Sequence, residues 1–197
     1  MMTVEVFTRP GTLTGAQRRD LGERMLAELL AEESAPESVL DGVRGLTHVL
    51  VHEPSTWVTR GDGPRYLVRV TVPGSWHTKE FGAHLIPKIT ALVAATEDDP
   101  TRLYREPHCQ VQIVGLKEHG VGTLGRPQSA TDLTRLMTDG YRTSAEKPTA
   151  APGTAIDPVC GMAVDLATAT ITLDHDGTRH VFCAPVCRKV FAEELAG

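Results

Sequence analysis

The chain has few aromatic residues, no long apolar run and no cluster of basic residues. Aromatic side chains make up 5% of its 197 residues, and no apolar stretch is long enough to cross a bilayer. The formal net charge is -5 and the basic residues are scattered, so nothing favours binding to nucleic acid. The first residues lack the basic segment and apolar segment of a secretory leader. We therefore expect a cytoplasmic protein that binds neither membranes nor nucleic acid.

Cysteine is also scarce, but three of the four cysteines are concentrated near the carboxyl end. Cys160 lies in DPVCGM, and Cys183 and Cys187 lie in HVFCAPVC. The spacing of Cys183 and Cys187 places both on one side of a tight turn or a first helical turn. Thiolates select copper(I) or zinc over magnesium and calcium, which prefer oxygen ligands. The spacing predicts one site for a soft metal ion, which Cys160 completes from upstream.

Two alternatives to a metal site are open for these cysteines. A pair of them could form a disulfide or take part in redox chemistry, and each could be a small buried side chain. A segment of about forty residues buries too little surface to be stable without a metal, a disulfide or a neighbour. An odd number of thiols in a reducing compartment favours the metal.

Residues 156 to 195 resemble a YHS domain, the small treble-clef-like cysteine module of heavy-metal ATPases and related metal-handling proteins. The resemblance implies a hairpin that carries Cys160 near its entry, a second strand ending at Phe182 and a terminal helix that starts near Cys183. The matching positions are Asp157-Pro158-Val159-Cys160-Gly161-Met162, Val164, Gly177, Phe182-Cys183, Cys187 and Phe191.

The chain departs from the YHS pattern beside the second cysteine. His180-Val181 replaces the usual aromatic residue, and Ala184 replaces a small polar residue. The fourth ligand is therefore open among His180, Asp157, Met162 and water, and His180 is our first candidate.

The amino-terminal part begins with a strand, a helix and a second strand. Residues 3–8 alternate apolar and polar side chains, and Thr14 with Gln17 makes a capping-box pattern before an apolar helical stripe. Residues 47–52 read as a strand after an acidic and polar loop, and residues 57–60 predict a short third strand.

The same pattern then repeats. Residues 65–72 alternate as a strand, apolar residues recur at helical spacing around Pro87, and residues 110–116 predict another strand. Pro87 should kink this helix or mark the start of its regular part. Glycines at 120, 122 and 125 predict a small hairpin. The repeat predicts an α+β fold with one mixed four-stranded sheet covered on one face by two helices.

This duplicated unit resembles the tautomerase superfamily, the group of macrophage migration inhibitory factor and 4-oxalocrotonate tautomerase. The likeness is carried by the strand at Thr3, by residues 65–72 with Pro73-Gly74 after them, and by the ending QVQIVGLKEHGVG. It implies a homo-oligomer, usually a ring of three chains. It also implies that Arg69, and then Arg65, bind a substrate carboxylate through the planar guanidinium. The alternative for both is a solvated or intersubunit ion pair.

The amino-terminal proline that these enzymes use as base or nucleophile is missing. The chain starts Met1-Met2-Thr3, and its first proline is Pro10, beyond the first strand. We therefore assign no catalytic residue.

Other candidate side chains lie outside the cysteine-rich end. We interpret the histidines as surface or hydrogen-bonded residues because their spacing makes no site, and Cys109 as a core thiol or an accessory ligand. Three residues near the expected rim of the sheet are further candidates for substrate binding. The histidines are His48, His52, His77, His84, His108 and His119, and the rim residues are Glu53, Trp57 and His52.

These patterns divide the chain into residues 1–128, a tautomerase-like domain; residues 129–155, a short helix and flexible linker; and residues 156–197, a YHS domain. The first hypothesis is a non-enzymatic protein that senses, buffers or delivers copper or zinc with a metal-handling partner. The second is a tautomerase or hydratase-like enzyme acting on a small oxo-acid. The missing proline favours the first.

Overall fold

The computed structural model describes residues 1–31, 34–61 and 63–196, and the chain forms two compact units. The first unit combines Met1–Leu30 with Thr47–Lys117, and the second combines Ala31–Leu46 with Glu118–Gly197. The segment between the first helix and the second strand is therefore part of the second unit. The three-part division at residues 128 and 155 stays a prediction.

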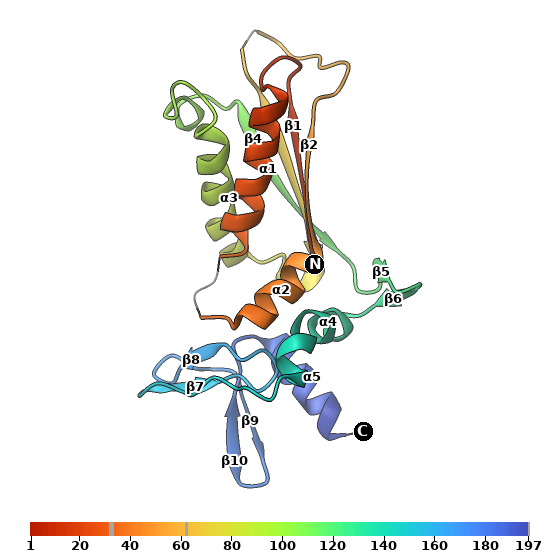
Figure 1. The fold of residues 1–197 in the computed structure, drawn as a ribbon, viewed down its shortest axis with the longest axis vertical. Coiled ribbons are helices and arrows are strands. Elements are labelled where there is room, and N and C mark those ends of the chain that lie inside the picture. The colour runs from red at the N-terminus through yellow and green to blue at the C-terminus, as the bar shows by residue number, and fades with distance from the viewer. Residues whose placement is uncertain (32–33, 62, 197) are drawn as a thin grey trace. The chain divides into compact units, whose positions relative to one another are not determined.

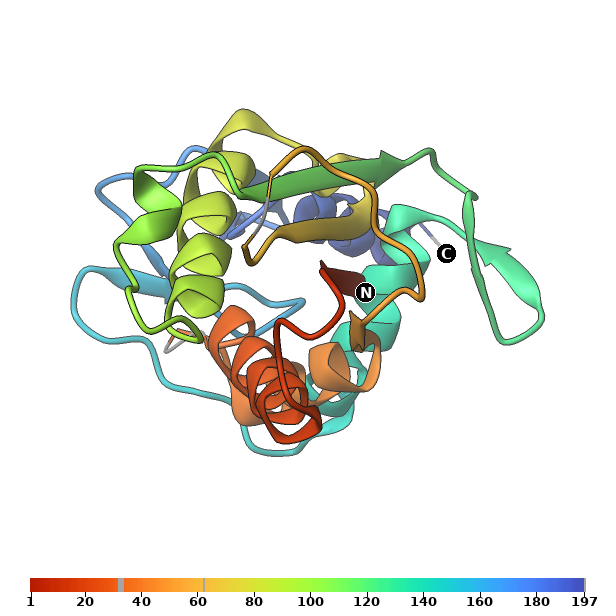
Figure 2. The same ribbon diagram turned by 90° about the horizontal axis from the view of Figure 1, so that it is seen from above.

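The first unit is a four-stranded sheet with two helices on one face (Figure 1, Figure 2). The sheet order is β2-β1-β3-β4, with parallel pairs β1–β2 and β3–β4 and an antiparallel pair β1–β3. Helices α1 and α3 connect the parallel pairs and contact each other. The predicted α+β fold is confirmed. Its elements are β1 (Met2–Thr8), α1 (Gly15–Leu29), β2 (Thr47–His52), β3 (Tyr66–Pro73), η1 (Gly74–Trp76), α3 (Lys79–Ala94), η2 (Arg102–Tyr104) and β4 (Cys109–Leu116).

The core of this unit lies between the sheet and the helices. Alternate strand residues face the helices because successive side chains of a strand point to opposite sides. Each helix contributes one apolar stripe. The fully buried apolar residues include Val4, Val6, Val68 and Val70 from the strands and Leu21, Met25, Ile89 and Val93 from the helices. The opposite face of the sheet carries partly buried residues such as Phe7 and Leu67.

Two sequence-based predictions about the connections were wrong. Residues 57–60 form no strand, and Val58 is 90% exposed, so the alternation in this stretch does not mark a face that packs on the core. The expected polar loop before β2 contains helix α2 (Glu37–Gly45). Val39 and Val43 recur at helical spacing, but with nine residues the segment is too short for this spacing alone to predict a helix.

The second unit packs α2, α4 and α5 together with three small hairpins. Helix α4 contacts both α2 and α5, and Arg135 of α4 pairs with Glu193 of α5 at 2.6 Å. The predicted glycine-rich hairpin is present as β5–β6. No helix in the described ranges is long and apolar enough to span a bilayer. The elements are β5 (Val121–Thr123), β6 (Arg126–Gln128), α4 (Ala130–Thr143), β7 (Thr154–Ile156), β8 (Ala163–Asp165), β9 (Thr172–His175), β10 (Thr178–Val181) and α5 (Pro185–Leu195).

Helices α2 and α4 approach each other closely at glycines. A Cβ atom on Gly42 of α2 would lie 2.2 Å from the carbonyl oxygen of Met137 in α4. A Cβ atom on Gly140 of α4 would lie 3.3 Å from the carbonyl oxygen of Ser38. At Gly42 the backbones can meet only because the position lacks a side chain, and at Gly140 a side chain would fit only tightly.

Candidate metal centre

The sulfurs of the three carboxyl-terminal cysteines lie together in the second unit. Cys160 lies in the connection between β7 and β8, Cys183 lies two residues before the start of α5, and Cys187 lies in the first turn of that helix. The Sγ atoms of Cys160 and Cys183 are 3.4 Å apart, and those of Cys183 and Cys187 are 3.7 Å apart. Cys160 and Cys187 are each 4% exposed, Cys183 is half-buried, and none of them is in a disulfide.

Local sequence explains how the two segments present these thiols. Pro185 is compatible with the first turn of α5, so the helix can begin two residues after Cys183, and Cys187 lies in its first turn. Gly161 has φ of 72°, a left-handed conformation that glycine adopts without strain. A Cβ atom on Gly161 would lie 2.4 Å from the ring of Tyr141 and 2.7 Å from Pro36. The Cys160 loop therefore packs directly on α4 and on the start of α2.

A carboxylate completes the cluster. Asp157 is fully buried, and one of its oxygens lies with the three sulfurs in a group whose atoms are all within 4.8 Å of one another. Its Oδ1 accepts hydrogen bonds from the backbone N–H groups of Val159 at 2.8 Å and Cys160 at 3.3 Å. Its Oδ2 accepts one from the N–H of Cys183 at 2.8 Å.

The pKa values of the three thiols are shifted in different directions. Hydrogen bonds from Cys183 and Cys187 lower the pKa of Cys160, and the contacts with Cys160 raise the pKa of Cys183 and of Cys187. Burial raises the pKa of Asp157, and the charge of Cys160 raises it further. Of the three thiols, Cys160 therefore loses its proton most readily.

These four residues could hold a metal ion, and the sulfur separations fit such an ion. Zn–S bonds of about 2.3 Å at tetrahedral angles separate two sulfurs by about 3.8 Å. The observed separations of 3.4 and 3.7 Å are close to that value. The sulfur-rich donor set suits zinc or copper(I), and the geometry does not choose between them.

The other candidate ligands named from the sequence are His180 and Met162. The group of four does not include His180, whose ring centre lies 4.6 Å from that of Phe191. Met162 packs against the buried cluster of Val159, Cys160, Phe182, Cys187 and Val190, which includes two of the three thiols. His180 as fourth ligand stays a prediction.

The two arginines named from the sequence are not brought together in one site. Arg69 Nη1 lies 3.9 Å from Glu5 on β1, and its side chain lines a hollow of about 390 Å³ with Phe7, Trp57 and Leu67. Arg65 precedes β3 and donates to the carbonyl oxygen of Arg60 at 2.9 Å. Substrate binding by either arginine stays a prediction.

Several of the other named residues have partners inside the first unit. The ring of His52 stacks on Phe7 at 4.8 Å, and His108 Nδ1 lies 2.6 Å from Arg102. Glu53 pairs with Arg18. Cys109 begins β4, and burial raises its pKa to about 11.

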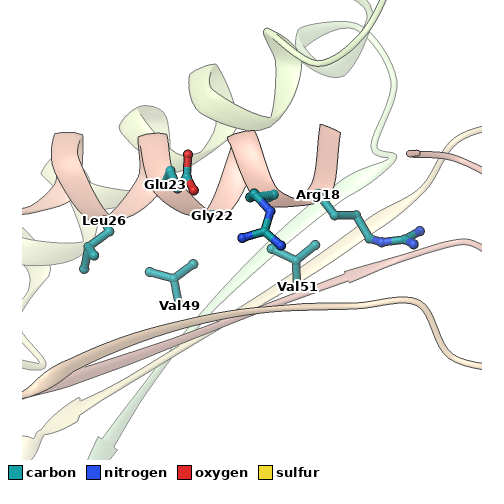
Figure 3. Close-up of a pocket in the computed structure, with 7 residues that line it drawn as sticks. Arg18, Gly22, Glu23, Leu26, Val49 and Val51 are labelled. Atoms are coloured by element: carbon teal, nitrogen blue, oxygen red, sulfur yellow. The ribbon is translucent and has the colours of Figure 1, made fainter. Parts of the chain in front are cut away.

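A hollow that the sequence did not reveal lies between α1 and the edge strand β2 (Figure 3). Its volume is about 410 Å³, and Val49 and Val51 of the strand face Gly22 and Leu26 of the helix across it. A Cβ atom on Gly22 would lie 3.7 Å from Val51, an ordinary van der Waals contact, so an alanine would fit in this hollow.

No protein-family model and no curated protein matches the chain. Among the solved structures similar to it is a fused 4-OT described as a symmetric trimer, at 18% identity over 66% of this chain and 97% of that chain, with a TM-score of 0.49. A member of the cis-3-chloroacrylic acid dehalogenase family is 17% identical over 66% and 86%, with a TM-score of 0.46. Macrophage migration inhibitory factor from Oncomelania hupensis is 10% identical over 65% and 82%, with a TM-score of 0.45. These neighbours have tautomerase-superfamily folds. The fold of this chain is assigned from its own strand order and register, described above.

Proposed function

We propose that this chain is a metal-binding protein whose Cys160, Cys183 and Cys187 bind one copper(I) or zinc ion for sensing, buffering or delivery. The convergence of three sulfurs from two segments in a buried setting carries the proposal. Free thiols favour a reducing compartment, so we place the protein in the cytoplasm. The YHS resemblance supports a metal-handling partner.

Titration of the reduced, metal-free full chain tests this function. Cadmium(II) is a useful probe because thiolate-to-metal charge transfer reports sulfur ligation directly. One ion per chain, bound with three thiolates, is the expected result. A titration that shows only weak binding without a charge-transfer band would reject the proposal.

Metal affinity should fall steeply as the pH is lowered. Cys183 and Cys187 have raised pKa values and hold protons at neutral pH, whereas Cys160, whose pKa is lowered, is ionised. Binding therefore releases about two protons per ion, and the apparent association constant should fall about 100-fold for each pH unit lost near pH 7. Competition with a chelator of known affinity between pH 6 and pH 8 measures this slope. A flat profile would mean that these thiols do not bind the ion.

We also propose that the chain forms a homotrimer. In the described sheet, β2 and β4 each pair on one side only, and the face opposite the helices exposes Leu50 and Val114 by 43% and 38%. Such edges and apolar residues favour covering by another copy. Light scattering of the full chain should give three times the 21.3 kDa chain mass. A strictly monomeric mass at micromolar concentration would contradict it.

The second candidate function is a tautomerase or hydratase-like activity on a small oxo-acid. The hollow beside Arg69 favours it, because an arginine above Phe7 and Leu67 suits a carboxylate with an apolar body. We expect no turnover, because the described residues that line this hollow include no carboxylate, histidine, lysine or cysteine that could act as a base. Assays with a simple enol or halo-acid test this expectation. Robust turnover by the wild type that is lost in Arg69→Ala would promote the enzyme.

A further inference from the structure

Asp157 joins the two segments that supply the sulfurs. Its carboxylate receives N–H groups from Val159 and Cys160 on one oxygen and from Cys183 on the other. Cys160 and Cys183 are separated by 23 residues, so this one side chain brings together backbone that is distant in the chain. The carboxylate is fully buried, and N–H bonds to a carboxylate are stronger than those to a neutral acceptor.

We propose that Asp157 is a positioning residue that holds Cys160 and Cys183 at metal-binding distance, so that three thiolates and not the carboxylate bind the ion. This inference rests on the proposed metal-binding function and specifies how the site recognises its ion. It assigns the fourth position to none of the residues in the cluster.

The geometry favours positioning over ligation. A carboxylate ligand must approach a zinc ion to about 2.0–2.2 Å, which would draw an oxygen away from the N–H groups that it accepts. Both oxygens of Asp157 are already engaged in this way. A fourth anion bound to the ion would also increase repulsion within a cluster of three thiolates.

A site of three thiolates determines which metal ion is favoured and from which side the ion is exchanged. Three sulfurs without an oxygen donor favour a soft ion such as copper(I). Cys183 is the most exposed of the three sulfur-bearing residues. An incoming thiolate from a donor or acceptor would therefore reach the ion on the Cys183 side, where the fourth position would be filled from outside the cluster.

Amide NMR of the full chain tests the inference, with cadmium(II) as the probe ion. In the metal-free wild type, the Cys183 amide proton should be shifted downfield and protected from exchange, and both features should persist after cadmium binds. If Asp157 instead becomes a ligand, the Cys183 amide should move upfield and lose protection on loading. That result would overturn the proposal.

Two substitutions provide the second readout. Asp157→Asn places an NH₂ group or a weaker neutral acceptor against the Cys183 N–H, so exchange of that amide should accelerate at least about 100-fold, with a smaller effect at Val159. Cadmium should still bind three thiolates at saturation, with affinity at least about 10-fold lower. Asp165→Asn is the matched control, because the side chain of Asp165 is exposed and accepts the N–H of Ala167, a near neighbour in the chain. It should change neither property.

The metal-free and metal-loaded measurements test the positioning role of Asp157 and the proposed metal binding separately. A wild type that binds no cadmium defeats the proposed function, while exchange at Cys183 in the metal-free variants still tests the role of Asp157. Unchanged Cys183 exchange in Asp157→Asn defeats the positioning role even if the wild type binds cadmium tightly.

Discussion

Replacing Cys183 with serine is expected to lower the affinity for the bound ion by about 1000-fold or more. A serine hydroxyl does not ionise at neutral pH, so the ion loses one of three thiolate bonds. Apparent zinc-binding energies of about 10–16 kcal/mol, shared among a few ligands, correspond to about 4 kcal/mol for each ligand. Competition with a chromophoric chelator, using the reduced full chain, measures the loss.

Cys109→Ser is the matched control for this experiment. Cys109 begins β4 in the first unit, and the cluster of possible ligands in the described residues does not include it. Its replacement should leave the metal affinity unchanged. Equal affinities for the wild type and Cys183→Ser would contradict the assignment of Cys183 as a ligand.

A second large effect is expected from adding one methyl group to α2. In Gly42→Ala the new Cβ atom would lie 2.2 Å from the oxygen and 2.9 Å from the carbon of the Met137 carbonyl. These are backbone atoms of α4 and cannot rotate away, so the two helices must separate. Overpacking of this kind costs about 3 kcal/mol of the free energy of unfolding. Denaturant unfolding followed by circular dichroism measures the change.

Gly45→Ala is the control in the same helix. No atom lies within 4 Å of a Cβ atom built on Gly45, so alanine should be neutral or stabilise the helix by up to about 1 kcal/mol. Similar stabilities for the two variants would contradict the close packing of α2 on α4. Because the Cys160 loop rests on Tyr141 of α4, Gly42→Ala should also weaken metal binding.

The elements of the first unit could be predicted because their signals are local. Alternation marked β1 and β3, and Thr14 and Gln17 form the predicted capping box at the start of α1. Such patterns depend on neighbouring residues and survive in the folded chain. The convergence of three cysteines followed from their spacing and from the YHS resemblance.

Other features depend on contacts between distant residues and could not be predicted. Helix α2 has one buried residue, and its packing depends on a close approach between Gly42 and Met137, far apart in the sequence. The role of Asp157 depends on a hydrogen bond to Cys183, 26 residues away. His180 was the more conventional ligand by residue type, but its ring packs against Phe191. The identity of the fourth ligand therefore stays a prediction.

Elemental analysis of the protein purified under reducing conditions without added metal tests the central claim most directly. The wild type should contain one copper or zinc ion per chain, and a variant with serine at Cys160, Cys183 and Cys187 should contain none. Wild-type protein without metal that also fails to take up stoichiometric copper(I) or zinc, or a variant with the same metal content, would contradict the account.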